Sequence, residues 1–303
     1  MESILSYLDR GCVLVADGAT GTMFQNMGLE PGSAPELWNV ERSDAVRAHH
    51  RAYLDAGAQV ILTNTFGGCR LKLDRMSGLG DRVAELNRMG AELARIEAGG
   101  EAYVAGDIGP TGELMSPYGL LGYDDAVEVF FEQAAALVGG GADLLWIETM
   151  SDLDEAAAAV EGARRAAGDL PVFCTMSYAA RGRTVMGVKP SQMLDRLLPM
   201  GVSGVGANCG DGIEPVLAAL EEMRACLSTL DGVHPVLIAK PNAGVPRLEK
   251  GQTVFDLGPQ EMSKYVDLAV ELGAQIVGGC CGSTPEHVAA IAARVAEIDC
   301  EAK

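Results

Sequence analysis

Apolar runs of strand length alternate with helical patterns from one end of the chain to the other, and this alternation restricts the fold more than any other feature. The runs are continuously apolar, which indicates strands that are buried on both faces, as in a parallel sheet. The expected strands are Cys12–Ala16, Val60–Leu62, Tyr103–Ala105, Leu144–Ile147, Val172–Met176, Gly204–Ala207, Val236–Ala239 and Ala274–Val277. Helical patterns are expected near residues 45–56, 83–98, 124–138, 153–167, 192–198, 213–227 and 260–272, and a last one begins at residue 285.

Eight strand–helix units predict an α/β fold, a single (β/α)8 TIM barrel. No stretch rich in Pro, Gly or Ser divides the chain, so residues 1–303 are expected to form one barrel domain. The longest connections, residues 18–43 and 109–123, both follow strand ends. Because barrel enzymes carry their active site at the carboxyl ends of the strands, functional side chains are expected where each apolar run stops.

Polar and thiol side chains stand at these positions. They are Asp17, Asn64, Asp107, Glu148, Asn208, Cys209, Asn242, Cys280 and Cys281. In a barrel they would converge on one face. Three thiolates with one open position are typical of catalytic zinc, with Zn–S bonds of about 2.3 Å. The sequence therefore predicts a metal site made by Cys209, Cys280 and Cys281 at the C-terminal face of the strands.

Cys280 and Cys281 are adjacent and lie between glycines. Neighbouring residues of a strand point to opposite faces, so the backbone must bend for both thiols to face one target. Glycine permits such a bend, and vicinal cysteines are poorly placed to form a disulfide with each other. Two small buried hydrophobic side chains are the alternative interpretation of this pair. None of the four histidines follows a strand end, which argues against a histidine-based zinc site.

The formal net charge of -19 restricts the partners. It argues against nucleic acid, whose phosphates require Lys and Arg, and against an anionic membrane surface. No apolar run approaches the length of a transmembrane helix, and the first residues do not resemble a signal peptide. The eight cysteines are therefore interpreted as cytosolic thiols of a cytoplasmic protein rather than as a disulfide framework.

Asp17 and Glu148 allow several interpretations. Carboxylates at these positions could cap the next helix, hold an ammonium group through charge-assisted hydrogen bonds, or act as an acid–base pair in a metal-free hydrolase or lyase. The last interpretation leaves the cysteines unexplained. The turn Gly18–Thr22 could offer backbone amides to a substrate carboxylate, although it lacks the lysine of a phosphate-binding loop.

Seven motifs, in this order along the chain, resemble those of the homocysteine S-methyltransferase family. They are Asp17–Thr22 (DGATGT), Thr63–Gly67 (TNTFG), Gly106–Gly112 (GDIGPTG), Glu148-Thr149, Asn208-Cys209, Pro241–Gly244 (PNAG) and Gly278–Gly282 (GGCCG). Within the family, the likeness is to bacterial betaine–homocysteine methyltransferases and to the homocysteine-binding domain of cobalamin-dependent methionine synthase. The resemblance covers nearly the whole chain.

The resemblance implies a Zn²⁺ barrel that transfers a methyl group to the thiol of L-homocysteine and releases L-methionine. Cys209, Cys280 and Cys281 would be the zinc ligands and the catalytic centre. Asp17 and Glu148 would bind the amino group of homocysteine, and the backbone amides of Gly18, Ala19 and Thr20 would bind its carboxylate. Asn242 would lie beside the metal as a candidate for its open position. The related enzymes include dimers and tetramers, so a homo-oligomer is compatible with the resemblance.

The methyl donor is the open part of this prediction. Betaine, dimethylsulfoniopropionate and S-methylmethionine are onium donors, and an aromatic cage from Trp38, Phe66 and Tyr118 would bind such a cation. Thr149 stands where animal betaine enzymes have tyrosine, which leaves betaine itself in doubt. One alternative is a methylcorrinoid donor carried by a separate protein. Another is a non-catalytic barrel that binds zinc or thiols.

Overall fold

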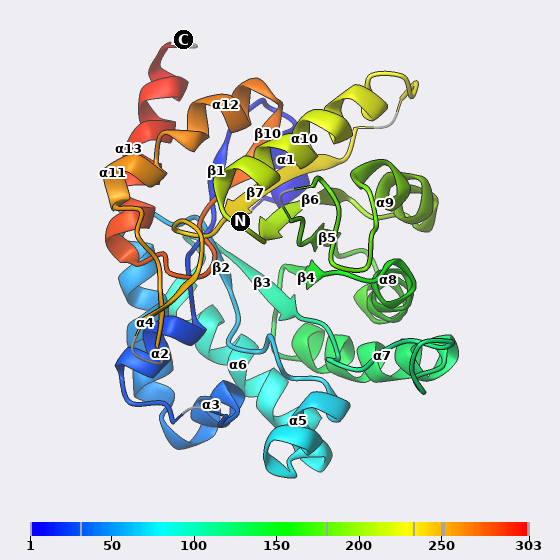
Figure 1. The fold of residues 1–303 in the computed structure, drawn as a ribbon. Coiled ribbons are helices and arrows are strands. Elements are labelled where there is room, and N and C mark those ends of the chain that lie inside the picture. Colours follow the sequence, from blue (N-terminus) through cyan, green and yellow to red (C-terminus); the bar gives the residue numbers. More distant parts are fainter. Residues whose placement is uncertain (1, 31, 180, 233, 250–251, 302–303) are drawn as a thin grey trace.

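The structure, a computed structural model, describes residues 2–30, 32–179, 181–232, 234–249 and 252–301. Eight parallel strands form one sheet in the order β1-β10-β7-β6-β5-β4-β3-β2, and a parallel bridge between Ala16 and Val60 joins β1 to β2. Helices surround this ring (Figure 1), so the predicted (β/α)8 barrel is confirmed. The barrel strands are β1 (Leu14–Val15), β2 (Val60–Leu62), β3 (Tyr103–Ile108), β4 (Leu144–Met150), β5 (Val172–Met176), β6 (Gly204–Cys209), β7 (Val236–Pro241) and β10 (Ala274–Val277).

The helices pack their apolar faces on the outside of the ring. In α8 the side chain of Asp152 accepts hydrogen bonds from the amides of Asp154 and Glu155, which caps the N-terminus. The helix ends at Gly168, which has a positive φ of 58°. The α-helices are α1 (Ile4–Leu8), α2 (Gly21–Asn26), α3 (Trp38–Glu41), α4 (Ser43–Asp55), α5 (Arg70–Ser77), α6 (Val83–Ala98), α7 (Tyr123–Gly139), α8 (Leu153–Ala167), α9 (Pro190–Leu197), α10 (Ile213–Leu227), α11 (Pro259–Met262), α12 (Tyr265–Glu271) and α13 (Pro285–Glu301), with 3-10 turns at η1 (Pro35–Leu37), η2 (Gly80–Arg82) and η3 (Leu198–Met200).

The structure differs from the sequence-based expectation in several features, including the short helices α1, α2, α3 and α5, which were not expected. Strands β3, β4, β6 and β7 continue through polar residues, because a polar side chain can project into the barrel mouth while its backbone still pairs: Asn208 pairs with Lys240, and Cys209 with Pro241. The helix expected at residues 260–272 is split after Met262, where the Ser263 hydroxyl bonds back to the Gln260 carbonyl at 3.2 Å. A short antiparallel hairpin, β8 (Arg247–Glu249) with β9 (Gln252–Val254), was not expected.

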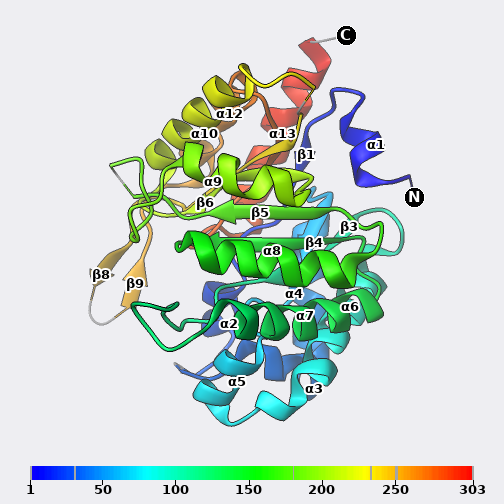
Figure 2. The ribbon, with the colours of Figure 1, turned by 90° about the vertical axis from the view of Figure 1, so that its right-hand side faces the viewer.

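The two ends of the barrel are built differently. At the amino end of the strands, Ile4 and Leu8 of α1 pack into the barrel interior with Leu14, Trp146 and Phe173, so that this end is apolar. Figure 2 shows α1 on this side and the β8–β9 hairpin on the opposite side. The carboxyl end therefore forms the open mouth. None of the described helices is long and apolar enough to span a membrane.

Candidate metal and substrate site

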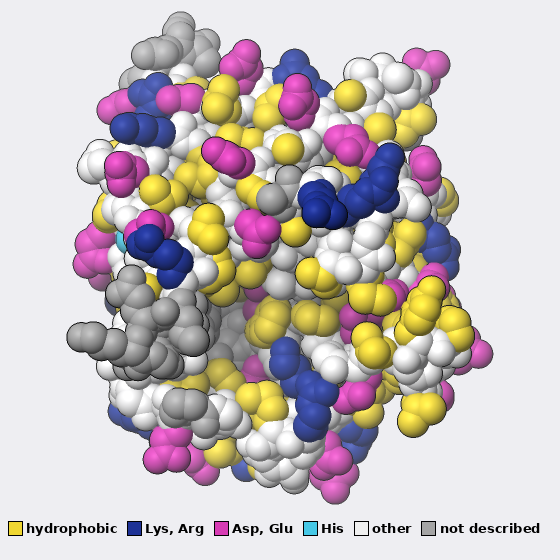
Figure 3. Space-filling view, in the orientation of Figure 1, with side chains coloured by type: hydrophobic (Ala, Val, Ile, Leu, Met, Phe, Trp, Pro, Cys, Tyr) yellow, Lys and Arg dark blue, Asp and Glu magenta, His cyan; other side chains and the backbone are white. Residues whose placement is uncertain are grey.

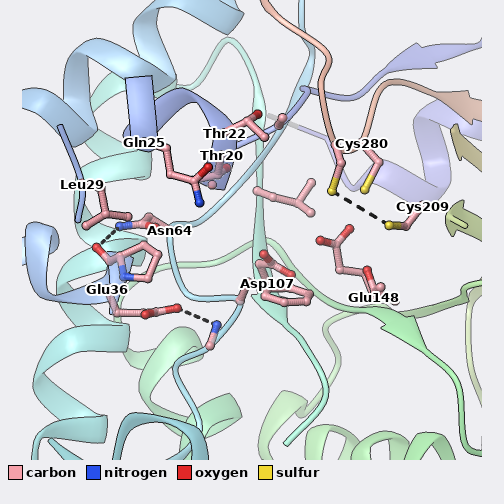
Figure 4. Close-up of a pocket in the computed structure, with 18 of the residues that line it drawn as sticks. Thr20, Thr22, Gln25, Leu29, Glu36, Asn64, Asp107, Glu148, Cys209 and Cys280 are labelled. Atoms are coloured by element: carbon pink, nitrogen blue, oxygen red, sulfur yellow. Dashed lines mark hydrogen bonds between the residues drawn. The ribbon is translucent and has the colours of Figure 1, made fainter. Parts of the chain in front are cut away.

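Three cysteine sulfurs meet at the barrel mouth. Cys209 is the last residue of β6, and Cys280 and Cys281 follow β10. The three Sγ atoms lie within 4.8 Å of one another, and Cys209 Sγ is 3.9 Å from Cys281 Sγ. Figure 4 shows thiols from these two parts of the chain turned toward each other. The arrangement that the sequence predicted for these three side chains is present.

An unusual backbone turn aims the Cys209 thiol. Cys209 has a φ of 60°, in the left-handed region that residues with a Cβ rarely occupy. Gly210 follows with a φ of 70°, and a Cβ at that position would overlap the Tyr178 carbonyl. The strand thus ends in a turn that only this glycine allows. Strain of this kind is found most often at functional sites.

A second turn presents Cys280 and Cys281 together. The Ser283 amide donates to the Cys280 carbonyl at 3.1 Å, and a Cβ on Gly279 would overlap the Ser283 hydroxyl. The Cys280 amide donates to the carbonyl of Pro241 at 2.9 Å. The Ala243 amide donates to the carbonyl of Cys281 at 3.0 Å. The turn is therefore fixed to the end of β7, and the glycines supply the bend that adjacent cysteines require.

The three thiols share their protons. Hydrogen bonds from the thiols of Cys280 and Cys281 lower the pKa of Cys209 to about 3. The hydrogen bond with Cys209 in turn raises the pKa of Cys280 to about 12, and it also raises that of Cys281. Within the cluster, ionisation of Cys209 is thus favoured over that of Cys280 and Cys281. A divalent cation would favour three thiolates, because it deprotonates coordinating thiols.

Glu148 lies next to the sulfurs and is positioned by Asn208. The Asn208 side chain donates to Glu148 Oε2 at 3.4 Å and to the Thr149 hydroxyl at 2.7 Å, and its Oδ1 accepts from the Thr149 amide at 2.8 Å. Thr149 has a φ of 62°, where the register between β4 and β5 shifts. Burial raises the pKa of Glu148 to about 8. Burial and the neighbouring Glu148 also raise the pKa of Asp107.

Asp17 forms a buried ion pair with Lys240. Its Oδ1 lies 3.2 Å from Lys240 Nζ, and its Oδ2 accepts from the Leu62 amide at 2.7 Å. Asp17 is 1% exposed and is not among the described residues that line the cavity, whereas Lys240 is. Of this pair, it is therefore the lysine that lines the cavity.

A cavity of about 490 Å³ extends from the sulfurs across the mouth. Figure 3 shows the hollow near the centre of this face. We call the part lined by Cys209, Cys280, Cys281, Glu148 and Lys240 the sulfur half, and the part lined by Leu29, Glu36, Phe66, Lys72 and Met76 the far half. In Figure 4, Asp107 lies between the two, and Glu36 lies opposite the cysteines.

The far half contains a carboxylate with a free oxygen and an aromatic ring. Glu36 is 1% exposed; its Oε1 accepts from the Gly67 amide at 2.6 Å, and its Oε2 has no hydrogen-bond partner among the described residues. The Lys72 ammonium lies 4.3 Å from the centroid of the Phe66 ring. Burial raises the pKa of Glu36. This half of the cavity therefore already accommodates a cation against a ring.

The predicted carboxylate turn and Asn242 lie at the edge of the site. Gly18, Ala19 and Thr20 line the cavity, but the Ala19 amide donates to Ser283 Oγ at 3.2 Å. Asn242 is buried and donates to the Gly210 carbonyl at 2.7 Å. A hydrogen bond from its side chain is one of the causes that lower the pKa of Cys209, while its Oδ1 has no partner in the described part of the chain.

Comparison with known protein families matches residues 14–295 to the family described as homocysteine S-methyltransferase. The chain belongs to the homocysteine S-methyltransferase family. It is 34% identical to the methionine synthase of Mycobacterium leprae over 95% of this chain and 24% of that protein. It is 35% identical to that of Mycobacterium tuberculosis over 94% of this chain and 25% of that protein. The chain thus spans about a quarter of the length of these relatives.

Among solved structures, the homocysteine methyltransferase MmuM from Escherichia coli has the same fold. Its oxidized form matches with a TM-score of 0.75 and 24% identity, over 97% of this chain and 100% of that chain. Its metallated form matches with a TM-score of 0.76 and 24% identity, over 95% and 98% of the two chains. At this level of identity the likeness concerns the fold.

The three aromatic residues expected to form a donor cage are not brought together in this member of the homocysteine S-methyltransferase family. Phe66 lines the cavity. Trp38 is not among the described lining residues, because its ring packs on Phe24, with 5.0 Å between the ring centroids. Tyr118 lies on the loop after β3 and is 77% exposed. The expected cage is therefore corrected to a single ring, Phe66.

Four residues of the site had no assigned role in the sequence-based prediction. They are Glu36, Asp107, Asn208 and Lys240. Asp107, Asn208 and Lys240 stand where apolar runs stop, and that position is the signal that marks them. Glu36 lies in the long connection between β1 and β2, where no pattern marks it.

Proposed function

We propose that this chain transfers a methyl group from a small onium donor to the thiol of L-homocysteine, giving L-methionine. The observation that carries the proposal is the meeting of three sulfurs from β6 and β10 beside a cavity large enough for two small molecules. Membership of the family supports the acceptor and the reaction. In the reaction the acceptor thiol gives up its proton to solvent and a sulfur–carbon bond forms. The bond from the methyl carbon to the onium atom breaks, with its electron pair passing to that atom.

We propose Zn²⁺ as the metal, with Cys209, Cys280 and Cys281 as its ligands. The fit rests on the donor set, because three thiolates suit zinc, and on the unpartnered Asn242 Oδ1, a neutral oxygen near Cys209. When bound, zinc would keep an acceptor sulfur as a thiolate at neutral pH. The chain's own residues hold the three sulfurs at fixed positions through the two turns described above.

Glu148 is the residue that we propose for the acceptor ammonium. It lines the cavity beside the cysteines, and Asn208 fixes its orientation. An ammonium group near it would lower its pKa from about 8 and keep it ionised. Gly18, Ala19 and Thr20 form the adjacent wall, against which the chain of the amino acid would pack.

The far half supports a small cationic donor. An onium methyl group would take the place that Lys72 Nζ holds over the Phe66 ring, next to the free oxygen of Glu36. Betaine, dimethylsulfoniopropionate and S-methylmethionine all have this charge. With a sulfonium donor, the transfer leaves a neutral thioether in place of the onium group, so that part of the product would bind the ring and carboxylate less well and could leave.

A methylcorrinoid on another protein or domain is the second candidate donor. It is favoured by the relatives named methionine synthase. The loops at the mouth also expose Leu114, Tyr118, Leu120 and Val185, which would suit a covering partner.

A donor screen tests both candidates. The zinc-loaded protein is incubated with homocysteine and each of betaine, dimethylsulfoniopropionate, S-methylmethionine and methylcobalamin, and methionine is measured. We expect methionine from at least one onium compound. Methionine from methylcobalamin alone would favour the second candidate. If homocysteine bound but no donor gave methionine, the result would support the alternative of a non-catalytic thiol-binding barrel.

A further inference from the structure

Asp107 is a buried carboxylate to which the proposed reaction gives no role. It belongs to β3, lines the cavity and is 5% exposed. Its Oδ1 is enclosed and has no hydrogen-bond partner among the described residues. A carboxylate in such a place is costly, since burial removes the water that would stabilise its charge. A bound ligand that brings a positive charge to this point would offset the cost.

Buried side chains fix the backbone of Asp107 and leave its carboxylate to the cavity. The Asp107 amide donates to the Thr63 hydroxyl at 2.9 Å, and its carbonyl accepts from the Thr65 hydroxyl at 2.7 Å. The Gln133 side chain also donates to this carbonyl at 3.4 Å. All three of these residues are buried. Because the main chain is held on both sides, the side chain keeps its direction into the barrel mouth (Figure 4).

Asp107 lies at the junction of the two halves of the cavity. Figure 4 shows it between Glu148 and Glu36. Asp107 interacts electrostatically with Glu148 and Cys280 of the sulfur half, whereas the charge that acts on Glu36 is that of Lys72 in the far half. Atoms that are about to react lie about 3–3.5 Å apart in a productive complex. The onium atom of a donor must therefore come to this junction to bring its methyl group to an acceptor sulfur beside the cysteines.

The Phe66 ring packs against the same end of β3. Gly109 follows the strand, and its amide donates to the Phe66 carbonyl at 3.0 Å. A Cβ on Gly109 would overlap the Phe66 ring. The strand that carries the Asp107 carboxylate thus ends in contact with the aromatic ring. A ring face and a carboxylate attract the same ligand group, a cation, because both act on its charge.

The charges around the junction are mostly negative. Burial and the neighbouring Glu148 raise the pKa of Asp107, and Asp17 acts in the same direction. Lys240 partly offsets them, but its ammonium pairs with Asp17 at 3.2 Å. A cation held beside Asp107 would lower its pKa again and keep the carboxylate ionised. An onium group suits an oxygen that lacks a hydrogen-bond donor, because it has a positive charge but no N–H or S–H.

We propose that Asp107 binds the onium centre of the methyl donor at the point of transfer, with Phe66 and Glu36 on the far side of that centre, and that it selects cationic donors over neutral ones. This inference rests on the proposed function, in which the donor is an onium compound. The positive charge at the onium atom decreases as its bond to the methyl carbon breaks. The contact therefore stabilises the bound donor more than the transition state, so its loss should raise the KM for the donor without a comparable fall in kcat.

Two matched pairs of ligands test the role of the charge. They are betaine with 3,3-dimethylbutanoate, and dimethylsulfoniopropionate with 4-methylpentanoate; in each pair a carbon replaces the onium atom and removes its charge. Each ligand is titrated calorimetrically into the zinc-loaded protein in the presence of saturating L-homoserine, which has the charges of homocysteine but no thiol to methylate. We expect the parent protein to bind at least one onium compound roughly tenfold more tightly than its carbon isostere.

Asp107→Asn should bind that onium compound about tenfold more weakly and its isostere with nearly parent affinity, because only the charge is lost. Asp107→Ser also removes the carboxylate, with a smaller side chain; it protects the test against misfolding and should give the same selective loss. The matched control is Asp124→Asn, in the exposed first turn of α7, which should bind every ligand as the parent does. With homocysteine present, the donor KM of both Asp107 variants should rise about tenfold, while kcat changes by less than about threefold.

Three results would overturn the inference while the parent protein still forms methionine. The first is a preference for the onium compound that both Asp107 variants retain. The second is an equal loss of affinity for the onium compound and its isostere in both variants, which would indicate a structural role. The third is weaker binding of homocysteine with unchanged donor affinity, which would place Asp107 at the acceptor. A parent protein that binds no onium compound and forms methionine from none would instead overturn the proposed onium donor, and this inference with it.

Discussion

The residues of the sulfur half and those of the far half come from different kinds of structural element. In the sulfur half, Cys209, Glu148 and Lys240 lie at or near the carboxyl ends of barrel strands, and hydrogen bonds to neighbouring strands fix them. In the far half, Glu36 and Phe66 lie in connections, and Lys72 lies on α5 outside the sheet. One oxygen of Glu36 has no partner among the described residues.

This difference suggests a division of labour. A site on strand ends keeps its geometry as long as the barrel is intact, whereas a site on connections can change with loop sequence. We infer that the acceptor end is set by the fold and that the donor end is set by the loops. Members of one family can then share an acceptor and differ in donor.

The largest effect should come from Cys281→Ser in the sulfur half. Loss of one sulfur should abolish stoichiometric zinc and lower turnover by at least about 1,000-fold, because a free thiol is only a few per cent thiolate and positioning is worth about 100-fold. Metal analysis and methionine formation check this. Cys226→Ser, on α10 and outside the cavity, is the control and should retain both. Stoichiometric zinc and unchanged turnover in the Cys281 variant would contradict the proposed metal site.

Glu148→Gln should weaken binding of the acceptor, homocysteine, and leave binding of the donor unchanged. The amide keeps the shape and can still contact Asn208, but it loses the charge that would pair with an ammonium. We expect the KM for homocysteine to rise roughly 10- to 100-fold, while zinc content and the KM for the donor stay unchanged. An equal rise in both KM values would show that the two halves are not separate.

Glu36→Gln is the corresponding change in the far half. We expect the KM for an onium donor to rise about tenfold, since the carboxylate faces the proposed cation, and homocysteine affinity to stay the same. Steady-state kinetics with each substrate varied in turn measures this. If the KM for homocysteine rose and the KM for the donor did not, the assignment of acceptor and donor to the two halves would be reversed.

His50→Leu should change how stability depends on pH and leave turnover unchanged, since His50 lies on α4 and is not among the described residues that line the cavity. Both ring nitrogens lack partners among the described residues, and burial lowers the pKa of His50 from 6.5 to about 4. The unfolded chain therefore binds this proton first as pH falls below 6.5. Through this residue alone, the free energy of unfolding should be roughly 2 kcal/mol lower at pH 5 than at pH 7.

The variant should lose that part of the acid sensitivity and should be about as stable as the parent at pH 7, because it buries no unpaired nitrogen. Urea unfolding at pH 7 and pH 5 measures both. An unchanged difference between the two pH values would show that His50 is not the source.

The sequence predicted the sulfur half better than the far half, for a physical reason. Cys209 and Glu148 stand at the end of an apolar run, and the barrel rule places such ends on one face. The path of the connection that carries Trp38 is decided by tertiary packing, here against Phe24. The pairing of Asp17 with Lys240 spans 223 positions, and nothing in the local pattern shows it.

Strand boundaries were predicted less well for a related reason. Polar residues at the mouth were expected to end the strands, yet β3 continues through Asp107 to Ile108. The backbone there pairs with β4 whatever the side chain, since Asp107 lies opposite Trp146 in the register. Apolar patterns therefore locate the core of a strand and miss its functional end.

X-ray absorption at the zinc edge, with and without homocysteine, tests the central claim most directly. We predict three sulfur ligands and one nitrogen or oxygen ligand for the zinc-loaded protein, and four sulfur ligands after homocysteine is added. Fewer than three sulfurs before addition, or no change after it, would contradict a cysteine site that receives the acceptor thiol.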